Sequence, residues 1–433
     1  MGRRWLLSFW KALGSLFAQT LHISIMRWRD DHSCHAKKRA HRGPREEGAE
    51  VVRQRTSRMP DDRERGDATF VGMALALLLL IGANAHAAST LKVGVAGPLT
   101  GDQATLGQEL KGGAIIAVEE WNAKGGLLGR KIEIVLGDDQ HDPRQAVAVA
   151  NKFVNEGVVG VIGHFNSSCS IPASTIYRDG KVVQLTPAST NPQFTERGLW
   201  NVFRVCGRDD QQGGVVANFI VRKLQKRRIA VLHDKTTYGQ GLADETVKAL
   251  EKAKVKPVYY GGVTQGEKDF RPVLTAVRLS DPEVLFYGGI YPEAILLTKQ
   301  MRELGMKTVF MSGDGVWAKA FIDIAGKAAE GSFITFTPDQ TKIKEAQEVI
   351  RRHKEKFGTE VGAYTVYSYV AATVLFEAIA TTQSTDSIKI ADHIRRTKWK
   401  TALGPIQFDK KGDVLVSPYV IWEVKDGKFV ELQ

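Results

Sequence analysis

The first predicted strand and helix lie in residues 91–126, which read LKVGVAGPLTGDQATLGQELKGGAIIAVEEWNAKGG. The small and β-branched residues from Leu91 to Ala96 predict a buried strand. Apolar residues then recur at helical spacing over about Gly107–Lys124, and the pair Gly125-Gly126 ends the helix. This stretch therefore predicts a strand followed by a helix, the unit from which parallel sheets are built.

The same alternation continues along the rest of the chain. Further strands are expected near residues 131–136, 158–162, 182–186, 229–233, 258–260, 284–287 and 309–311, mostly separated by helix-length amphipathic stretches. Residues 342–397 are predicted to be mainly helical, and residues 419–431 to form a hairpin around Asp426-Gly427. The pattern predicts an α/β protein with doubly wound parallel sheets, which bind ligands at the carboxyl ends of their strands.

The length and the charge distribution of the chain limit the classes of protein to which it can belong. A chain of 433 residues with 43% apolar residues is long enough for two hydrophobic cores. The net charge of +12 is concentrated at the N-terminus, because residues 1–58 alone contribute +8. Residues 88–433 carry 45 basic and 39 acidic side chains without a basic stripe, so no nucleic-acid partner is expected.

The N-terminal region predicts export. Residues 72–87 form an apolar run that ends in Ala85-His86-Ala87, which predicts a signal peptide over 59–87 and cleavage before Ala88. A membrane anchor is the alternative, but the apolar core is shorter than the ~20 residues that a spanning helix needs. Residues 1–58 are interpreted as a leader of doubtful translation, upstream of the true start and disordered.

Cysteine is scarce. Cys34 lies in the leader, which leaves only Cys169 and Cys206, too few for a disulfide scaffold and without zinc-type spacing. Whether these two residues pair is left open. No metal and no cofactor are expected.

Polar segments follow several of the predicted strands. Residues 163–168 and 186–190 are rich in hydroxyl groups, and residues 234–239 and 312–315 supply Tyr238 and Asp314. Hydroxyls and helix N-terminal amides on one wall and Asp314 on the other suit a zwitterion. Purely structural roles are the alternatives: the serines of the first segment could cap a helix, and Asp314 could be a turn residue before glycine.

Catalytic signatures are missing from the sequence. It contains no nucleophile elbow, P-loop, dinucleotide-binding glycine fingerprint or metalloprotease His-Glu-x-x-His motif. His164 lies near Ser167 and Ser168 in sequence, but such proximity is weak support for a catalytic triad. The chain is therefore expected not to be an enzyme.

Several segments carry a resemblance to a known family. They are Gly97-Pro98-Leu99-Thr100-Gly101, Trp121-Asn122-Ala123-Lys124-Gly125-Gly126, Asp142-Pro143, Val161-Ile162-Gly163-His164, Thr186-Pro187-Ala188, His233-Asp234-Lys235 and Gly266-Glu267-Lys268-Asp269-Phe270. In these segments the sequence resembles the Leu/Ile/Val-binding proteins of the type I periplasmic binding protein family. The resemblance runs through essentially all of residues 88–433.

The resemblance implies two Rossmann-like lobes joined by a hinge of three crossovers, near Arg208, Phe336 and Tyr419. Lobe 1 would comprise residues 88–208 and 337–419, and lobe 2 residues 209–336 and 420–433. The family implies a monomer that binds a branched-chain or similar small amino acid and delivers it to the permease subunits of an ABC importer.

The ligand contacts are also carried over from the family by position. Ser167 and Thr190 would hold the ligand carboxylate, and the Ala188 carbonyl and Asp314 would hold the ammonium. Tyr238 would close over the ligand from lobe 2. The candidates for the side-chain pocket are Leu106, Ile290, Tyr291 and Tyr364.

Departures from the family pattern weaken the prediction of ligand identity. His141 and Asn166 stand where the relatives carry a disulfide, Leu106 and Ile290 replace tyrosines, and Asp314 replaces a longer glutamate. The alternatives are a receptor for an amide, urea or aromatic acid on the same fold, and a ligand-sensing module.

Overall fold

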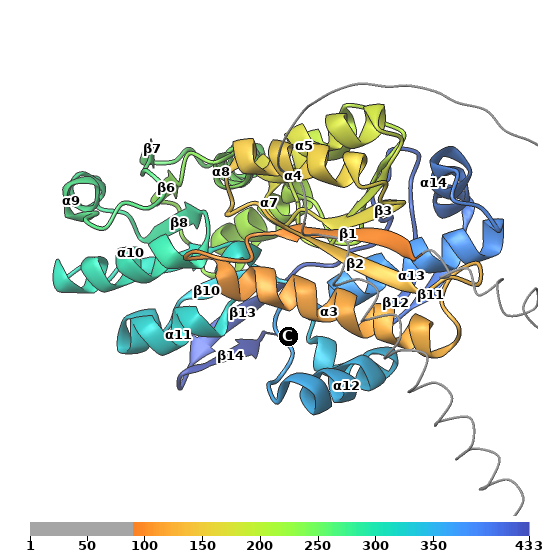
Figure 1. Ribbon diagram of the computed structural model, residues 1–433. Coiled ribbons are helices and arrows are strands. Elements are labelled where there is room, and N and C mark those ends of the chain that lie inside the picture. Colours follow the sequence, from red (N-terminus) through yellow and green to blue (C-terminus); the bar gives the residue numbers. More distant parts are fainter. Residues whose placement is uncertain (1–89, 433) are drawn as a thin grey trace, which may run out of the picture. The chain divides into compact units, whose positions relative to one another are not determined.

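The computed structural model describes residues 90–432, so the predicted leader, signal peptide and cleavage site lie outside the described residues. Two main sheets with flanking helices organise this part of the chain (Figure 1). The α/β class with two doubly wound sheets, predicted from the sequence, is confirmed. Within residues 90–432 no helix is both long and apolar enough to cross a bilayer.

The first sheet is parallel throughout, with strand order β2-β1-β3-β4-β5. Its strands are β1 (Leu91–Gly97), β2 (Ile132–Asp138), β3 (Gly160–Gly163), β4 (Val183–Thr186) and β5 (Val202–Arg204). The associated helices are α3 (Ala104–Ala123), α4 (Pro143–Asn155), α5 (Ser167–Asp179), α6 (Gln193–Glu196) and α13 (Thr365–Thr382). Helices α4 and α5 cover one face of the sheet, whereas α3 and α13 pack together against the other (Figure 1).

The second sheet has the order β14-β13-β10-β9-β8-β6-β7. Its strands are β6 (Ile229–His233), β7 (Tyr259–Gly262), β8 (Val284–Gly288), β9 (Val309–Ser312), β10 (Phe333–Phe336), β13 (Val420–Lys425) and β14 (Lys428–Glu431). Strands β6 to β10 are mutually parallel, and the predicted C-terminal hairpin adds β13 and β14 as antiparallel edge strands. The helices of this part are α7 (Asp209–Asn218), α8 (Thr237–Lys252), α9 (Arg271–Leu279), α10 (Tyr291–Glu303) and α11 (Lys319–Ala325).

The remaining elements connect β10 to β13. They are α12 (Gln347–Phe357), α14 (Ser387–Arg396) and the antiparallel pair β11 (Lys398–Thr401) and β12 (Gly404–Gln407). The predicted helical character of residues 342–397 is confirmed. Strands β5, β10, β11 and β12 were not predicted. Length alone does not explain this, since the four-residue strands β3, β4 and β9 were predicted; β11 and β12 lack the apolar run that marks those strands.

The chain passes between the elements of the two sheets three times: between β5 and α7, after β10, and before β13. The first and third passages lie side by side, because a Cβ atom on Gly207 would overlap the ring of Tyr419. These passages contain or adjoin the predicted crossovers at Arg208, Phe336 and Tyr419. The exact lobe boundaries remain a prediction.

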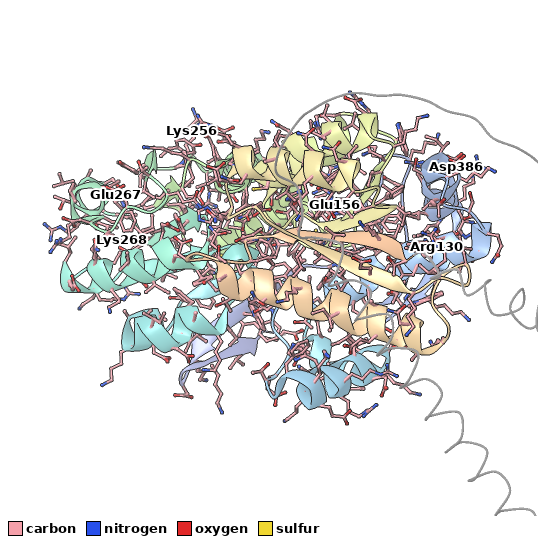
Figure 2. The ribbon with its side chains drawn as sticks, viewed as in Figure 1. Arg130, Glu156, Lys256, Glu267, Lys268 and Asp386 are labelled. Atoms are coloured by element: carbon pink, nitrogen blue, oxygen red, sulfur yellow. The ribbon has the colours of Figure 1, made fainter. Side chains whose placement is uncertain are left out.

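Burial follows the expected pattern for parallel sheets. Every residue of β3, β4, β6 and β8 is buried, as expected for strands covered on both faces. Charged side chains such as Glu156, Lys256 and Asp386 lie at the outside of the fold (Figure 2). The polar residues that are buried are therefore the informative ones.

Helices α3 and α13 approach so closely that position 113 has no room for a side chain. A Cβ atom on Gly113 would overlap the carbonyl oxygen of Thr365 at the start of α13. On the neighbouring Gly112 it would lie 3.5 Å from the His353 ring, which is ordinary contact.

We therefore expect Gly113→Ala to lower the free energy of unfolding by about 2–4 kcal/mol, because helix backbone must move to relieve the overlap. Gly112→Ala is the matched control, and its better helix propensity should raise stability by up to about 1 kcal/mol. Urea unfolding of both variants measures the difference. Equal stabilities would show that the two helices are not packed as described.

Candidate functional site

Two polar loops of the first sheet meet at the carboxyl ends of β3 and β4. Ser167 begins α5 after β3, and Thr190 lies in the loop after β4. The Ser167 hydroxyl accepts a hydrogen bond from the Asn191 backbone N–H at 3.2 Å. This bond joins the two loops. The Ser167 hydroxyl therefore holds the loop after β4 against the start of α5 and does more than cap its own helix.

The predicted carboxylate-binding residues are deeply buried. Ser167 is 1% and Thr190 0% exposed, and Ala188 between the two loops is 7% exposed. The Thr190 carbonyl accepts the backbone N–H of Asp209, which begins α7. The Thr190 hydroxyl has no hydrogen-bond partner among residues 90–432.

The second sheet contributes a buried carboxylate. Asp314 lies just after β9 and is 4% exposed. Tyr238, at the start of α8, donates its hydroxyl to Asp314 Oδ1 at 2.8 Å and accepts the Gly315 N–H at 3.0 Å. Tyr364, just before α13, donates to Asp314 Oδ2 at 3.2 Å. Asp314 is therefore held by hydroxyls from both parts of the fold, which is more than a turn residue before glycine requires.

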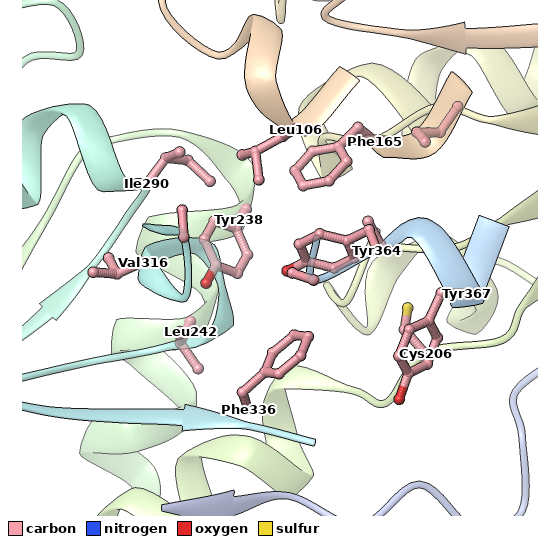
Figure 3. Close-up of a cluster of buried hydrophobic side chains, with 14 of the residues drawn as sticks. Leu106, Phe165, Cys206, Tyr238, Leu242, Ile290, Val316, Phe336, Tyr364 and Tyr367 are labelled. Carbon is pink, nitrogen blue, oxygen red and sulfur yellow. The ribbon is translucent and has the colours of Figure 1, made fainter. Parts of the chain in front are cut away.

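Apolar side chains pack beside the two tyrosines that hold this carboxylate. Figure 3 shows Leu106 between Ile290 and Phe165, with Tyr238 and Tyr364 below them, all within one cluster of buried side chains. The Tyr364 ring contacts Phe165 edge-on at a centroid distance of 4.7 Å and Phe336 at 5.7 Å. The structure thus brings three of the four predicted pocket residues together with Tyr238.

The fourth predicted pocket residue, Tyr291, makes a different contact. Its hydroxyl donates to the Asp102 carbonyl at 2.6 Å, which links α10 to the loop after β1. A second link is formed by the Asn191 side-chain amide, which donates to the Thr237 carbonyl at 2.7 Å. The site is therefore bounded by hydrogen bonds between elements of the two sheets.

Two functional candidates were missed in the sequence. Asp209 and Gln212, on the first turn of α7, are each fully buried. Burial, and then the nearby charge of Asp314, raise the pKa of the Asp209 carboxyl well above its usual range. Their signal in the sequence is weak, since acidic residues at a helix start are also typical of a solvent-exposed helix cap.

The pKa of Asp314 is also raised. Burial is the main cause, and it is opposed by the polar side chains of Gln212, Tyr238 and Tyr364 beside the carboxylate. Two neighbouring acids in a dry site disfavour their own ionised forms, and a bound cation would stabilise them.

Unsatisfied polar atoms gather at the same place. The Thr190 hydroxyl, both carboxylate oxygens of Asp209 and both amide atoms of Gln212 are buried and make no well-formed hydrogen bond within residues 90–432, although Thr190 lies beside the Asp209 carboxyl and Gln212 beside the Asp314 carboxyl. Leaving such an atom unpaired costs about 1–3 kcal/mol, so a cluster of them indicates a place where a polar ligand binds.

Catalytic and metal chemistry find no support in this geometry. His164, 0% exposed, is bound on one ring nitrogen by Asp139 at 2.7 Å and on the other by Tyr177 at 2.9 Å, so it is not available to Ser167. Over the described part of the chain, no three His, Cys, Asp or Glu side chains are grouped as a metal site. Cys169 and Cys206 are buried free thiols and do not pair.

Comparison with known proteins defines the class. The sequence model of the family described as periplasmic binding protein matches residues 90–428. The chain belongs to this family of binding proteins, which agrees with the expectation that it is not an enzyme.

Individual relatives define the branch of the family. Leu/Ile/Val-binding protein homolog 2 of Brucella abortus is 44% identical over 360 residues, which cover 83% of this chain and 96% of the relative. The leucine-binding protein LivK of Thermotoga maritima superposes with a TM-score of 0.75 at 31% identity, covering 79% of this chain and 98% of that chain. An ABC transporter substrate-binding protein of Desulfitobacterium hafniense in complex with Leu superposes with a TM-score of 0.67 at 25% identity, covering 79% and 100%. The sequence-based recognition of the Leu/Ile/Val-binding branch is confirmed.

Another acid, besides Asp209 and Asp314, binds the backbone of Tyr364. Glu109 of α3 accepts the Tyr364 backbone N–H at 3.2 Å, and a Cβ atom on Gly362 would overlap its carboxyl group. Burial raises the pKa of Glu109 from 4.5 to about 7, although the N–H groups of Tyr364 and Ala363 oppose the shift.

Because the folded-state pKa is raised, the associated stability is full below pH 4.5 and is lost as pH rises through about 7. Glu109→Gln removes this titration. We expect the stability of this variant minus that of the native chain to be about 1–2 kcal/mol larger at pH 8 than at pH 5. This value is reduced because the Glu109 side chain is partly exposed to solvent. Urea unfolding at both pH values measures the change, and a pH-independent difference would contradict the assignment.

Proposed function

We propose that the chain is the substrate-binding protein of an ABC importer and holds a small apolar amino acid between its two sheets. The proposal rests on Asp314, a buried carboxylate whose charge acts on Asp209, the residue whose backbone N–H binds the Thr190 carbonyl. The names of the relatives, which include Leu/Ile/Val-binding and leucine-binding proteins, support the same ligand class.

The two charged ends of an amino acid fit opposite walls of the site. Its carboxylate would accept hydrogen bonds from the Ser167 and Thr190 hydroxyls and from backbone N–H groups of their loops. Its ammonium would donate to Asp314 and to the Ala188 carbonyl, with Asp209 as a second nearby acid. Charge-assisted hydrogen bonds contribute about 1.5–3 kcal/mol each, enough to offset the removal of both charges from water.

The side chain of the ligand would enter the apolar part of the site. Leu106, Ile290 and Tyr364 are each at most 3% exposed and offer no charged group. Such a pocket favours an aliphatic side chain, because each buried CH₂ group contributes about 0.8 kcal/mol. A branched-chain amino acid is the ligand class that suits it best.

The proposed role extends to location and partners. The chain would be exported, cleaved before Ala88, and act in the periplasm as a monomer that binds no nucleic acid. Lobes 88–208 with 337–419 and 209–336 with 420–433 would close on the ligand about the three passages between the sheets. The permease subunits of the importer would receive the closed form.

Isothermal titration tests the proposal. Protein stripped of ligand by unfolding and refolding should bind leucine, isoleucine or valine with a Kd of about 1 μM or below, the range in which about 8 kcal/mol of binding energy is available. Asp314→Ala should weaken this binding at least about tenfold, because the buried ammonium loses a charged partner.

Asp323→Ala is the matched control, since it removes an exposed acid from the same region of the chain and should leave the affinity unchanged. The titration should also include urea, short amides and benzoate. Binding of those ligands alone would reject the amino-acid assignment, and an unaffected Asp314→Ala variant would reject the site.

A further inference from the structure

A buried arginine supports the loop that carries Thr190. Arg204, the last residue of β5, is 0% exposed. Its Nη1 donates to the Ser189 carbonyl at 2.6 Å, and its Nη2 donates to the Asn191 carbonyl at 2.9 Å. One guanidinium therefore fixes the backbone on both sides of Thr190.

The charge of this guanidinium is balanced by one carboxylate. Arg204 Nε donates to Asp413 Oδ1 at 2.6 Å, and Asp413 is 4% exposed. Asp413 lies in the turn after β12, where its own N–H is held by the Asp409 side chain at 2.9 Å. The turn is also fixed to β5, because the Arg204 N–H donates to the Gly412 carbonyl at 2.9 Å.

The same carboxylate reaches the passage between the sheets. Arg208 Nη1 donates to Asp413 Oδ2 at 2.6 Å, and Arg208 immediately precedes α7. The next residue, Asp209, donates its backbone N–H to the Thr190 carbonyl. Asp413 thus bridges two arginines, one behind the Thr190 loop and one where the chain leaves the first sheet.

We propose that Asp413 is a positioning residue for ligand binding, which holds Arg204 against the Ser189–Asn191 backbone and ties this loop to Arg208. The inference rests on the proposed function, because it takes Thr190 as a ligand-binding residue. Without the Asp413 charge, the buried guanidinium loses its anionic partner and the two carbonyls lose a fixed donor. Hydrogen bonds from the loop to a ligand are directional, so a small displacement weakens them.

A role in stability alone predicts a different result. It would lower the melting temperature of Asp413 variants and leave the affinity for ligand and the motion of the loop unchanged. The positioning role predicts changes in both, since Arg204 also donates to the Ser189 and Asn191 carbonyls of the loop that carries Thr190, besides the Thr195 hydroxyl on α6.

The test compares Asp413→Asn with Lys411→Gln in the purified protein. Lys411 lies in the same turn and pairs with the exposed Glu196, which also contacts Arg208 at 2.9 Å. Lys411→Gln therefore removes a charge from this turn while leaving both contacts between Asp413 and the arginines in place. For Asp413→Asn we expect a Kd for leucine about tenfold higher and, without ligand, faster hydrogen exchange at the amides of Ser189 and Asn191. Lys411→Gln should stay within about twofold of the native chain in affinity.

A double-mutant cycle adds a measurement that a purely structural role of Asp413 would not change. Thr190→Ala should weaken binding less in the Asp413→Asn background than in the native chain, because both changes act on one loop. Arg208→Lys keeps the positive charge and decides the question if Asp413→Asn does not fold. We expect it to raise the Kd about threefold, since a lysine ammonium does not reproduce the planar donor set with which Arg208 contacts Asp413, Asp210 and Glu196 together.

The outcomes separate the two proposals. If the native chain binds no amino acid, the proposed function fails, and the exchange rates at Ser189 and Asn191 still decide the role of Asp413. Unchanged exchange at these amides in both Asp413→Asn and Arg208→Lys would overturn the inference. Additive losses in the double-mutant cycle would overturn it as well.

Discussion

The burial of the Asp314 carboxylate between elements of the two sheets constrains the rest of the structure. The buried carboxylate is stabilised by hydrogen bonds from the hydroxyls of Tyr238 and Tyr364, one from each part of the fold. An isolated buried charge is unfavourable, so this site must either protonate or receive a cation. In the proposed function that cation is the ammonium group of the ligand, and Ser167 and Thr190 would hold its carboxylate.

The polar groups around Asp314 form two functional sets. Ser167 and Thr190 present hydroxyls from the first sheet, whereas Asp209 and Gln212 bring unpaired polar atoms from the start of α7. Behind the first set, Arg204 contacts the loop backbone on both sides of Thr190, and Asp413 provides its carboxylate partner. Affinity in such a site depends on groups outside direct contact as well as on groups within it, because the loop geometry is set by the support.

Much of the fold was predictable from the sequence, because strands such as Ile229–His233 are continuous apolar runs followed by helix signals. The short strands β5 and β10 were not, since they carry no recognisable period. The nine site residues were named from polar loops and family resemblance, and their role in binding stays a prediction. Asp209, Gln212 and Asp413 were not found, because their importance depends on burial and on contacts between residues as far apart as Arg204 and Asp413.

The most direct test of the central claim is a crystal structure of the protein with leucine bound. We expect the ligand ammonium within hydrogen-bond distance of the Asp314 carboxylate, the ligand carboxylate at the Ser167 and Thr190 hydroxyls, and the ligand side chain against Leu106 and Ile290. A ligand bound elsewhere, or one whose ammonium faces away from Asp314, would contradict this claim.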